Sequence, residues 1–157
     1  MSRDTEALIQ EPAEVVRQWI EQVWNTGNLQ QIEHFHPPTF QNEGRLTTPA
    51  EALTWHKQMR TTFPDLHYAI EEIVVAGDRV VVRWLARATH QGTLWGLIPP
   101  TGKSVTWPGI HIVRVEAGQI VEIWAVANQA SILQQLGVRL VPPPSGANEL
   151  QNESNQL

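Results

Sequence analysis

The sequence predicts an α+β domain in which helices come first and a meandering antiparallel sheet follows. Up to Pro64 the apolar residues recur at the helical period of about 3.6, and beyond it they recur at a period of about 2. Turn signals at Gly77-Asp78, at Pro99 to Gly102 and at Ala117-Gly118 divide this second half into strands. Helices that precede a run of consecutive strands are typical of α+β folds, with the helices gathered on one face of the sheet.

Two helices are predicted in the first forty residues. The first covers residues 11–25, where apolar residues recur at helical spacing until the stop signal Thr26-Gly27-Asn28. A short second helix covers residues 29–35, and Pro37-Pro38 ends it.

A third helix is predicted from a capping box, Thr48-Pro49-Ala50-Glu51, in which proline takes the first helical position. This helix should run to about Thr62. Its apolar stripe contains Ala52, Trp55, Met59 and Phe63, and His56 lies beside the stripe.

Four long strands are predicted after the helices, at residues 67–76, 79–90, 103–115 and 119–127. Pro108-Gly109 marks a bend or bulge in the third strand. The domain is expected to span residues 12–141. Residues 1–11 and 142–157 are expected to be flexible, and the second of these segments has too few apolar residues to form a core.

The composition fits one domain that folds without disulfide bonds. The 157 residues include no cysteine, which excludes a disulfide framework and a cysteine nucleophile and fits a reducing compartment. The net charge is −5 and the basic residues are scattered, so a nucleic acid partner is not expected. The first eleven residues are polar and acidic, so we expect no secretion signal, and no apolar run is long enough to cross a membrane. We therefore expect a cytoplasmic protein.

Tryptophan dominates the aromatic residues, with seven tryptophans against three phenylalanines and one tyrosine. Strand alternation predicts that Trp84, Trp107 and Trp124 share one face of the sheet with His111. Apolar faces with a few polar groups are the usual lining of a pocket, so we expect this face to bind a small apolar organic molecule. Further candidate ligand-binding residues are Trp55, His56 and His90. The simpler interpretation of His90 is a solvated loop edge.

His111 is the candidate acid or base, because an imidazole titrates near neutral pH. The alternative is a buried core histidine that is hydrogen-bonded to a neighbour. His34 and His36 are too few for a metal site without a third ligand, and the prolines after them break any strand that would aim both, so no metal is expected.

Several ordered motifs resemble those of the SnoaL-like polyketide cyclases, also called ester cyclases, over about residues 15–137. The motifs are Phe63-Pro64-Asp65-Leu66, Thr89-His90-Gln91-Gly92, Pro99-Pro100-Thr101-Gly102-Lys103, Gly118-Gln119-Ile120-Val121-Glu122-Ile123-Trp124 and Gln135-Leu136-Gly137. The resemblance implies an NTF2-like fold, which is a cone of curved antiparallel sheet closed by helices.

The resemblance also implies a reaction, which is ring closure by intramolecular aldol condensation without metal or cofactor. In that family an aspartate near the end of the last strand removes the substrate proton, and a histidine on the preceding strand assists. His111 matches the histidine, whereas the position of the aspartate corresponds to Asn128, whose carboxamide is not a base. Ala125, the next candidate position, carries no acid either. Another polar position of the family, a histidine after the second helix, falls near Asn42.

Two functions therefore stay open. The chain is either a cyclase in which His111 acts as the base, or an NTF2-like protein that binds a small ligand or another subunit without catalysis. A weaker third interpretation is an isomerase acting on a steroid-type ring. We further expect a homodimer that packs through the outer face of the sheet. Strand alternation assigns to that face Leu85, Ile110, Ile112, Val121 and Ile123.

Overall fold

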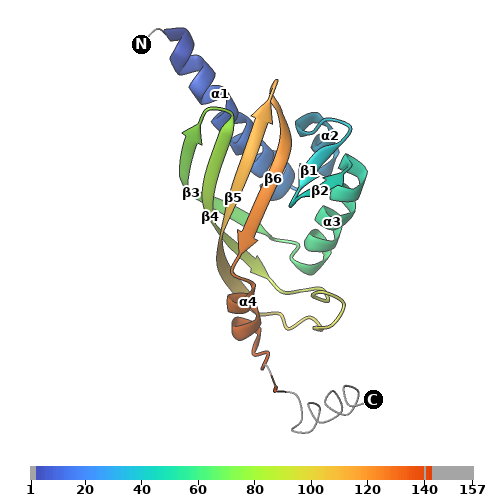
Figure 1. The fold of residues 1–157 in the computed structure, drawn as a ribbon. Coiled ribbons are helices and arrows are strands. Elements are labelled where there is room, and N and C mark those ends of the chain that lie inside the picture. The colour runs from blue at the N-terminus through green and yellow to red at the C-terminus, as the bar shows by residue number, and fades with distance from the viewer. Residues whose placement is uncertain (1–2, 140, 143–157) are drawn as a thin grey trace, which may run out of the picture.

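The computed structural model describes residues 3–139 and 141–142, with side chains from residue 11 onward. Helices pack against a curved sheet of six strands in the order β2-β1-β6-β5-β4-β3 (Figure 1). The predicted α+β fold is confirmed. In order the elements are α1 (Arg3–Trp19), η1 (Ile20–Asn25), η2 (Leu29–Gln31), α2 (Ile32–Phe35), β1 (Phe40–Asn42), β2 (Arg45–Thr47), α3 (Pro49–Thr62), β3 (His67–Ala76), β4 (Arg79–Thr89), β5 (Ser104–Glu116), β6 (Gln119–Ala127) and α4 (Gln129–Leu136).

The amino-terminal helix is longer than predicted and changes type near its end. It begins at Arg3 rather than residue 11, and the α-helix α1 gives way to a π-helical turn, η1, before Thr26. Val16, Trp19, Ile20 and Val23 are all buried, so this helix fills the concave side of the sheet with the apolar stripe that its sequence predicts.

The third helix begins as its sequence predicts. Thr48 Oγ1 accepts a hydrogen bond from the backbone N–H of Glu51, and the Glu51 carboxylate accepts one from the backbone N–H of Thr48. The predicted apolar stripe of α3 is partly wrong. Trp55 is 50 % exposed, whereas His56 is buried, because the face of α3 that packs inward passes through His56.

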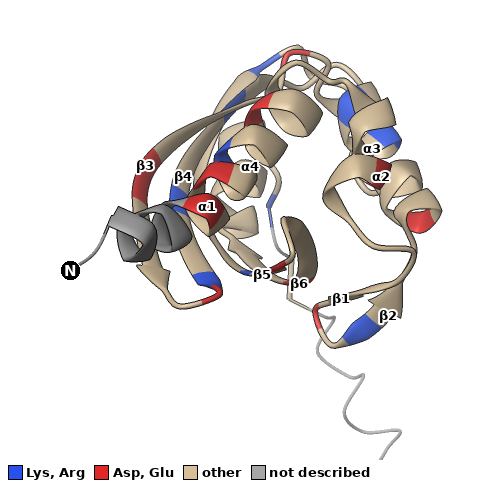
Figure 2. Cartoon of the chain, turned by 90° about the horizontal axis from the view of Figure 1, so that it is seen from above, with Lys and Arg blue, Asp and Glu red and all other residues tan. Residues whose placement is uncertain are grey.

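Viewed from above, the sheet curves from β3 round to β1 and β2, and α3 stands opposite β3 and β4 (Figure 2). The two short strands were not predicted. They form a hairpin whose β1 pairs in parallel with β6, with Gln41 opposite Glu122, and so extend the sheet beyond the meander. Acidic and basic residues are scattered over the elements, as expected from the sequence (Figure 2).

Strands β4 and β5 have the face assignments that alternation predicts. Their register is continuous from Arg79 opposite Arg114 to Thr89 opposite Ser104. Inward side chains such as Val82, Trp84 and Trp107 are therefore buried in strict alternation with outward ones. Pro108-Gly109 does not interrupt this pairing.

The predicted faces of β6 are wrong after its second residue. Ile120 pairs with Val115, but Glu122 pairs with Arg114, so Val121 is an extra residue in a β-bulge. One extra residue exchanges the two faces of the rest of a strand. Ile123 is consequently buried rather than on the outer face, and Trp124 points outward instead of inward.

Residues at the carboxyl end of the domain form an unpredicted helix, α4, that begins directly after β6. Gly137 ends it with φ at 80°, the left-handed conformation that glycine adopts readily at helix ends. Of the tail expected at 142–157, residues 143–157 lie outside the described part of the chain.

Candidate active site

A cavity of about 1280 Å³ lies between the concave face of the sheet and the helices. It extends from β5 and β6 to α3 and to the loop after β4. Six of the seven tryptophans contribute to its lining: Trp19, Trp24, Trp55, Trp84, Trp95 and Trp107. A lining of this kind presents flat apolar surface with few charges.

Three buried histidines also line the cavity, and they come from three distant parts of the chain. His36 follows α2, His56 lies in the middle of α3, and His111 lies in the middle of β5. They are 3 %, 5 % and 6 % exposed. These imidazoles pack against aromatic rings. The indole of Trp19 packs edge-to-face with both His36 and His111, with ring-centroid distances of 6.2 and 5.5 Å.

Protein hydrogen bonds fix the orientation of two of these imidazoles. Nδ1 of His111 accepts a 2.9 Å hydrogen bond from the indole N–H of Trp84, the residue that Gly109 allows to pack flat against β5. Nδ1 of His36 is 3.0 Å from the carbonyl oxygen of Ile120. A carbonyl oxygen only accepts, so Nδ1 of His36 carries a proton.

Burial keeps all three histidines neutral at pH 7. Desolvation lowers the pKa of His36 to about 4, although its bond to Ile120 acts in the opposite direction. Desolvation also lowers the pKa of His111 to about 4. The pKa of His56 falls to about 3, first through desolvation and then through repulsion by His36, Arg60 and His111. Each ring thus offers one donor and one acceptor nitrogen.

Carboxylates are scarce in the lining. Glu43 and Glu51 contribute to it, but both are exposed, and Glu51 is engaged in the capping box of α3. Ala125 is the β6 residue directly opposite His111, and it lines the cavity. The parts of β5 and β6 that line the cavity therefore place no carboxylate beside His111.

Asn128 does not line the cavity in the described structure. Its backbone N–H donates to the carbonyl of Pro108, and its side-chain oxygen accepts a 3.0 Å hydrogen bond from the backbone N–H of Ser131. It is the N-cap of α4, a position at which asparagine and aspartate are both favoured. The catalytic position predicted for Asn128 therefore has no geometric support.

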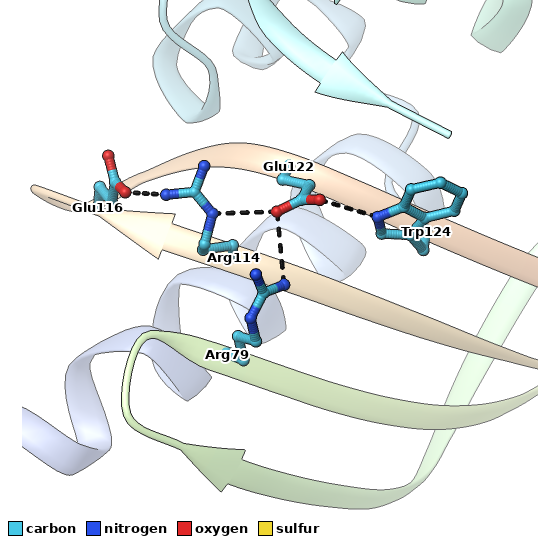
Figure 3. Close-up of polar contacts among 5 residues, drawn as sticks. All are labelled: Arg79, Arg114, Glu116, Glu122 and Trp124. Carbon is cyan, nitrogen blue, oxygen red and sulfur yellow. Dashed lines mark hydrogen bonds and ion pairs between the residues drawn. The ribbon is translucent and has the colours of Figure 1, made fainter. Parts of the chain in front are cut away.

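Trp124 lies on the outer face, where it is 46 % exposed. Its indole N–H donates to Glu122, and the same carboxylate bonds Arg114 and Arg79, while Arg114 also pairs with Glu116 (Figure 3). The predicted place of Trp124 in the pocket is wrong, and the bulge at Val121 is the reason.

His90 is fully buried, so its interpretation as a solvated loop edge is wrong. Its backbone bonds Gly102 and Lys103, and its Nδ1 accepts from the backbone N–H of Thr101. His90 does not line the cavity. Its hydrogen bonds instead join the two ends of the loop between β4 and β5.

Sequence reasoning missed His36 as a cavity residue. The sequence suggests His36 only as a metal ligand, because neighbouring prolines obscure the direction of the chain after α2.

Within the side chains that the structure describes, no group of three or more His, Asp or Glu residues is arranged to hold a metal ion. No helix among the described elements is long and apolar enough to cross a membrane.

The model of the SnoaL-like polyketide cyclase family matches residues 14–136. The chain belongs to this family. Solved structures agree with this membership: the putative polyketide cyclase of Acidithiobacillus ferrooxidans has 26 % identity over 81 % of this chain and 94 % of its own, with a TM-score of 0.73.

Two Streptomyces proteins are similarly close to this SnoaL-like chain. AclR of Streptomyces galilaeus, a putative hydroxylase, has 29 % identity over 82 % of this chain and 97 % of its own, with a TM-score of 0.72. IdmH of Streptomyces antibioticus, a putative polyketide cyclase, has 27 % identity over 81 % and 99 %, with a TM-score of 0.72. No protein with a curated functional description matches the sequence significantly. The recognition of the family and of its NTF2-like cone fold from the sequence is confirmed.

Proposed function

We propose that this SnoaL-like protein binds a small, mainly apolar carbonyl compound in the cavity and catalyses cofactor-free proton transfer on it, leading to aldol-type ring closure. The observation that carries the proposal is the position of His111. Its imidazole faces an aromatic cavity in a member of a cyclase family, and the bond from Trp84 holds it there. Family membership favours small organic ligands over other partners.

The second candidate is a binding protein without catalysis, and Ala125 favours it. A carboxylate at that inward position would lie across from His111, but the methyl group of alanine takes no proton. The names of the similar structures also attach more than one chemistry to this fold, so the fold alone does not decide between the candidates.

A binding and turnover assay separates the two candidates. Small aromatic polyketide methyl esters should quench the tryptophan fluorescence, and liquid chromatography with mass spectrometry should detect a cyclised alcohol that has the same mass as the substrate. Ala125→Phe should weaken the quenching by narrowing the cavity beside His111, whereas Val74→Phe, at an exposed position of β3 outside the cavity, should leave it unchanged. Binding without product would support the second candidate. If neither quenching nor product is found, both candidates fail.

The assembly and location are part of the same proposal. The outer face of the sheet carries Ile110, Ile112, Trp124 and Val126, which are between 40 % and 74 % exposed and lie beside the Arg114–Glu122 network. An apolar strip next to paired charges suits self-association about a two-fold axis, so we propose a homodimer through this face. We further propose a cytoplasmic protein without a nucleic acid partner, in keeping with the net charge of −5.

A further inference from the structure

The cavity nitrogens of His36 and His111 have opposite hydrogen-bonding character. The Nδ1 proton of His36 is donated to the Ile120 carbonyl, so in the neutral ring Nε2 has a free lone pair. Nδ1 of His111 accepts from Trp84, so in the neutral ring the proton is on Nε2. One ring therefore offers the cavity an acceptor and the other offers it a donor.

Position and rigidity favour using the two nitrogens together. Both residues line the cavity, and both rings contact the same indole, that of Trp19. His36 is further held by stacking on Phe40, with a centroid distance of 4.0 Å and an interplanar angle of 17°. Within the described chain neither Nε2 atom is hydrogen-bonded to protein, so a bound molecule meets no competing partner.

His56 differs from the other two histidines. Its ring packs on Trp24 with a centroid distance of 4.1 Å, and in the described structure no hydrogen bond fixes either of its nitrogens. Without a bonded nitrogen its tautomer is not set. It shapes the wall of the cavity, whereas the hydrogen-bonded pair has defined roles.

We propose that, on a substrate with a 1,3-dicarbonyl unit, Nε2 of His36 is the general base and Nε2–H of His111 stabilises the oxyanion. This inference rests on the proposed function. His36 takes the proton from the carbon between the two carbonyls, and the C–H electron pair forms the enolate C=C bond. The carbonyl π electrons move onto oxygen, which accepts the hydrogen bond from His111.

The second half of the reaction restores both histidines. The enolate carbon attacks a second carbonyl of the same molecule, so that a C–C bond forms and the C=O π bond becomes an alkoxide. The alkoxide takes the proton back from the His36 imidazolium. A weak, neutral base requires an acidic C–H, which is why a carbon between two carbonyls fits better than a simple ketone. The low pKa of His36, about 4, agrees with this requirement.

Isotope exchange tests the base without requiring ring closure. Ethyl 2-methyl-3-oxo-3-phenylpropanoate has a single hydrogen between its carbonyls, and NMR follows its replacement by deuterium in heavy water. The parent protein should accelerate this exchange over buffer. His36→Asn keeps an amide N–H near the Nδ1 position that bonds Ile120 but removes the lone pair. It should lower the exchange rate by a factor of about 10²–10⁴. The dissociation constant of the probe, measured by tryptophan quenching, should stay within threefold of that of the parent.

Matched variants complete the test. His34→Asn, at an exposed histidine two residues away, should exchange like the parent. His36→Gln, which also lacks a basic nitrogen, replaces His36→Asn if the latter does not fold by circular dichroism. His111→Leu should lower the rate by about 10²–10³, the usual effect of losing one oxyanion donor.

The outcomes separate this inference from the proposed function. Loss of exchange in a folded, probe-binding His36 variant supports the assignment. Exchange within threefold of the parent in such a variant overturns it and leaves the proposed function standing. A parent that binds the probe without accelerating exchange overturns the base assignment in favour of binding alone. A parent that does not bind contradicts the proposed function itself.

Discussion

The indole of Trp84 donates a hydrogen bond to His111 from directly above Gly109. A Cβ atom at position 109 would overlap Cη2 and Cζ2 of Trp84, so only glycine lets the indole reach its partner. The tautomer of a cavity histidine on β5 therefore depends on the absence of a side chain two residues earlier in the same strand.

Gly109→Ala should destabilise the protein by about 1–3 kcal/mol, because the added methyl group forces Trp84 out of its place. Urea denaturation measures the change. Combining the substitution with Trp84→Phe gives a double-mutant cycle, in which the two effects should be strongly non-additive. Additive effects would mean that the methyl group is accommodated without moving the indole.

Trp84→Phe should release Nδ1 of His111 from its donor. In the parent, ¹⁵N NMR of the imidazoles should show His111 protonated on Nε2, and the variant should show a mixture of tautomers. Loss of the buried bond and of packing should cost about 1–3 kcal/mol. The control is Leu97→Ala, at an exposed residue of the loop between β4 and β5, which should change stability by no more than about 0.5 kcal/mol.

The protein should lose stability in mild acid. His36, His56 and His111 have pKa values of about 4, 3 and 4 when folded and 6.5 when unfolded, so unfolding takes up protons between these values. Their contribution is complete above pH 6.5 and is lost as the pH falls toward 4, at about 1.4 kcal/mol per pH unit for each histidine. Urea midpoints at pH 7, 6 and 5 measure it. His56→Leu should flatten the dependence.

An aspartate is expected to act differently at two positions near the end of β6. Ala125→Asp places a carboxylate across the strand pair from His111, where apolar surroundings raise its pKa and make it a candidate base. It should increase exchange of the dicarbonyl probe. Asn128→Asp should leave both exchange and stability nearly unchanged, since aspartate caps α4 equally well. A gain at Asn128 and none at Ala125 would contradict the placement of these residues.

The proposed homodimer predicts that a charge on the outer face dissociates the protein. Sedimentation at micromolar concentration should give a dimer for the parent and a monomer for Ile112→Lys. Leu97→Lys is the control, since Leu97 is exposed but lies in the loop between β4 and β5. A monomeric parent would remove the dimer from the proposal.

Local patterns in the sequence predict the elements of this fold well. The capping box at Thr48 starts α3, and uninterrupted alternation gives the correct faces of β4 and β5. Features that depend on distant contacts were not predictable in this way. Buried His36 is hydrogen-bonded to the carbonyl of Ile120, which lies 84 residues later in the chain. The residues next to His36 in the sequence do not indicate that partner.

The same limit explains the misplaced site residues. The resemblance places the family's aspartate at Asn128, but the chain leaves the sheet at this point and the side chain caps a helix. Alternation does not fix the faces of β6, because Ile120 and Val121 are both apolar, and so are Ile123 and Trp124.

The extra residue at Val121 has a consequence for how cyclase-like cavities diversify. Straightening the bulge with every residue kept would slip β6 by one position, pair Trp124 with His111, turn Trp124 and Val126 to the cavity and send Ile123 and Ala125 outward. A one-residue change of register in β6 thus exchanges a whole set of wall residues at once, a larger step than point mutations provide. Relatives whose β6 has the same length but no bulge should accept differently shaped molecules even where their β4 and β5 sequences agree.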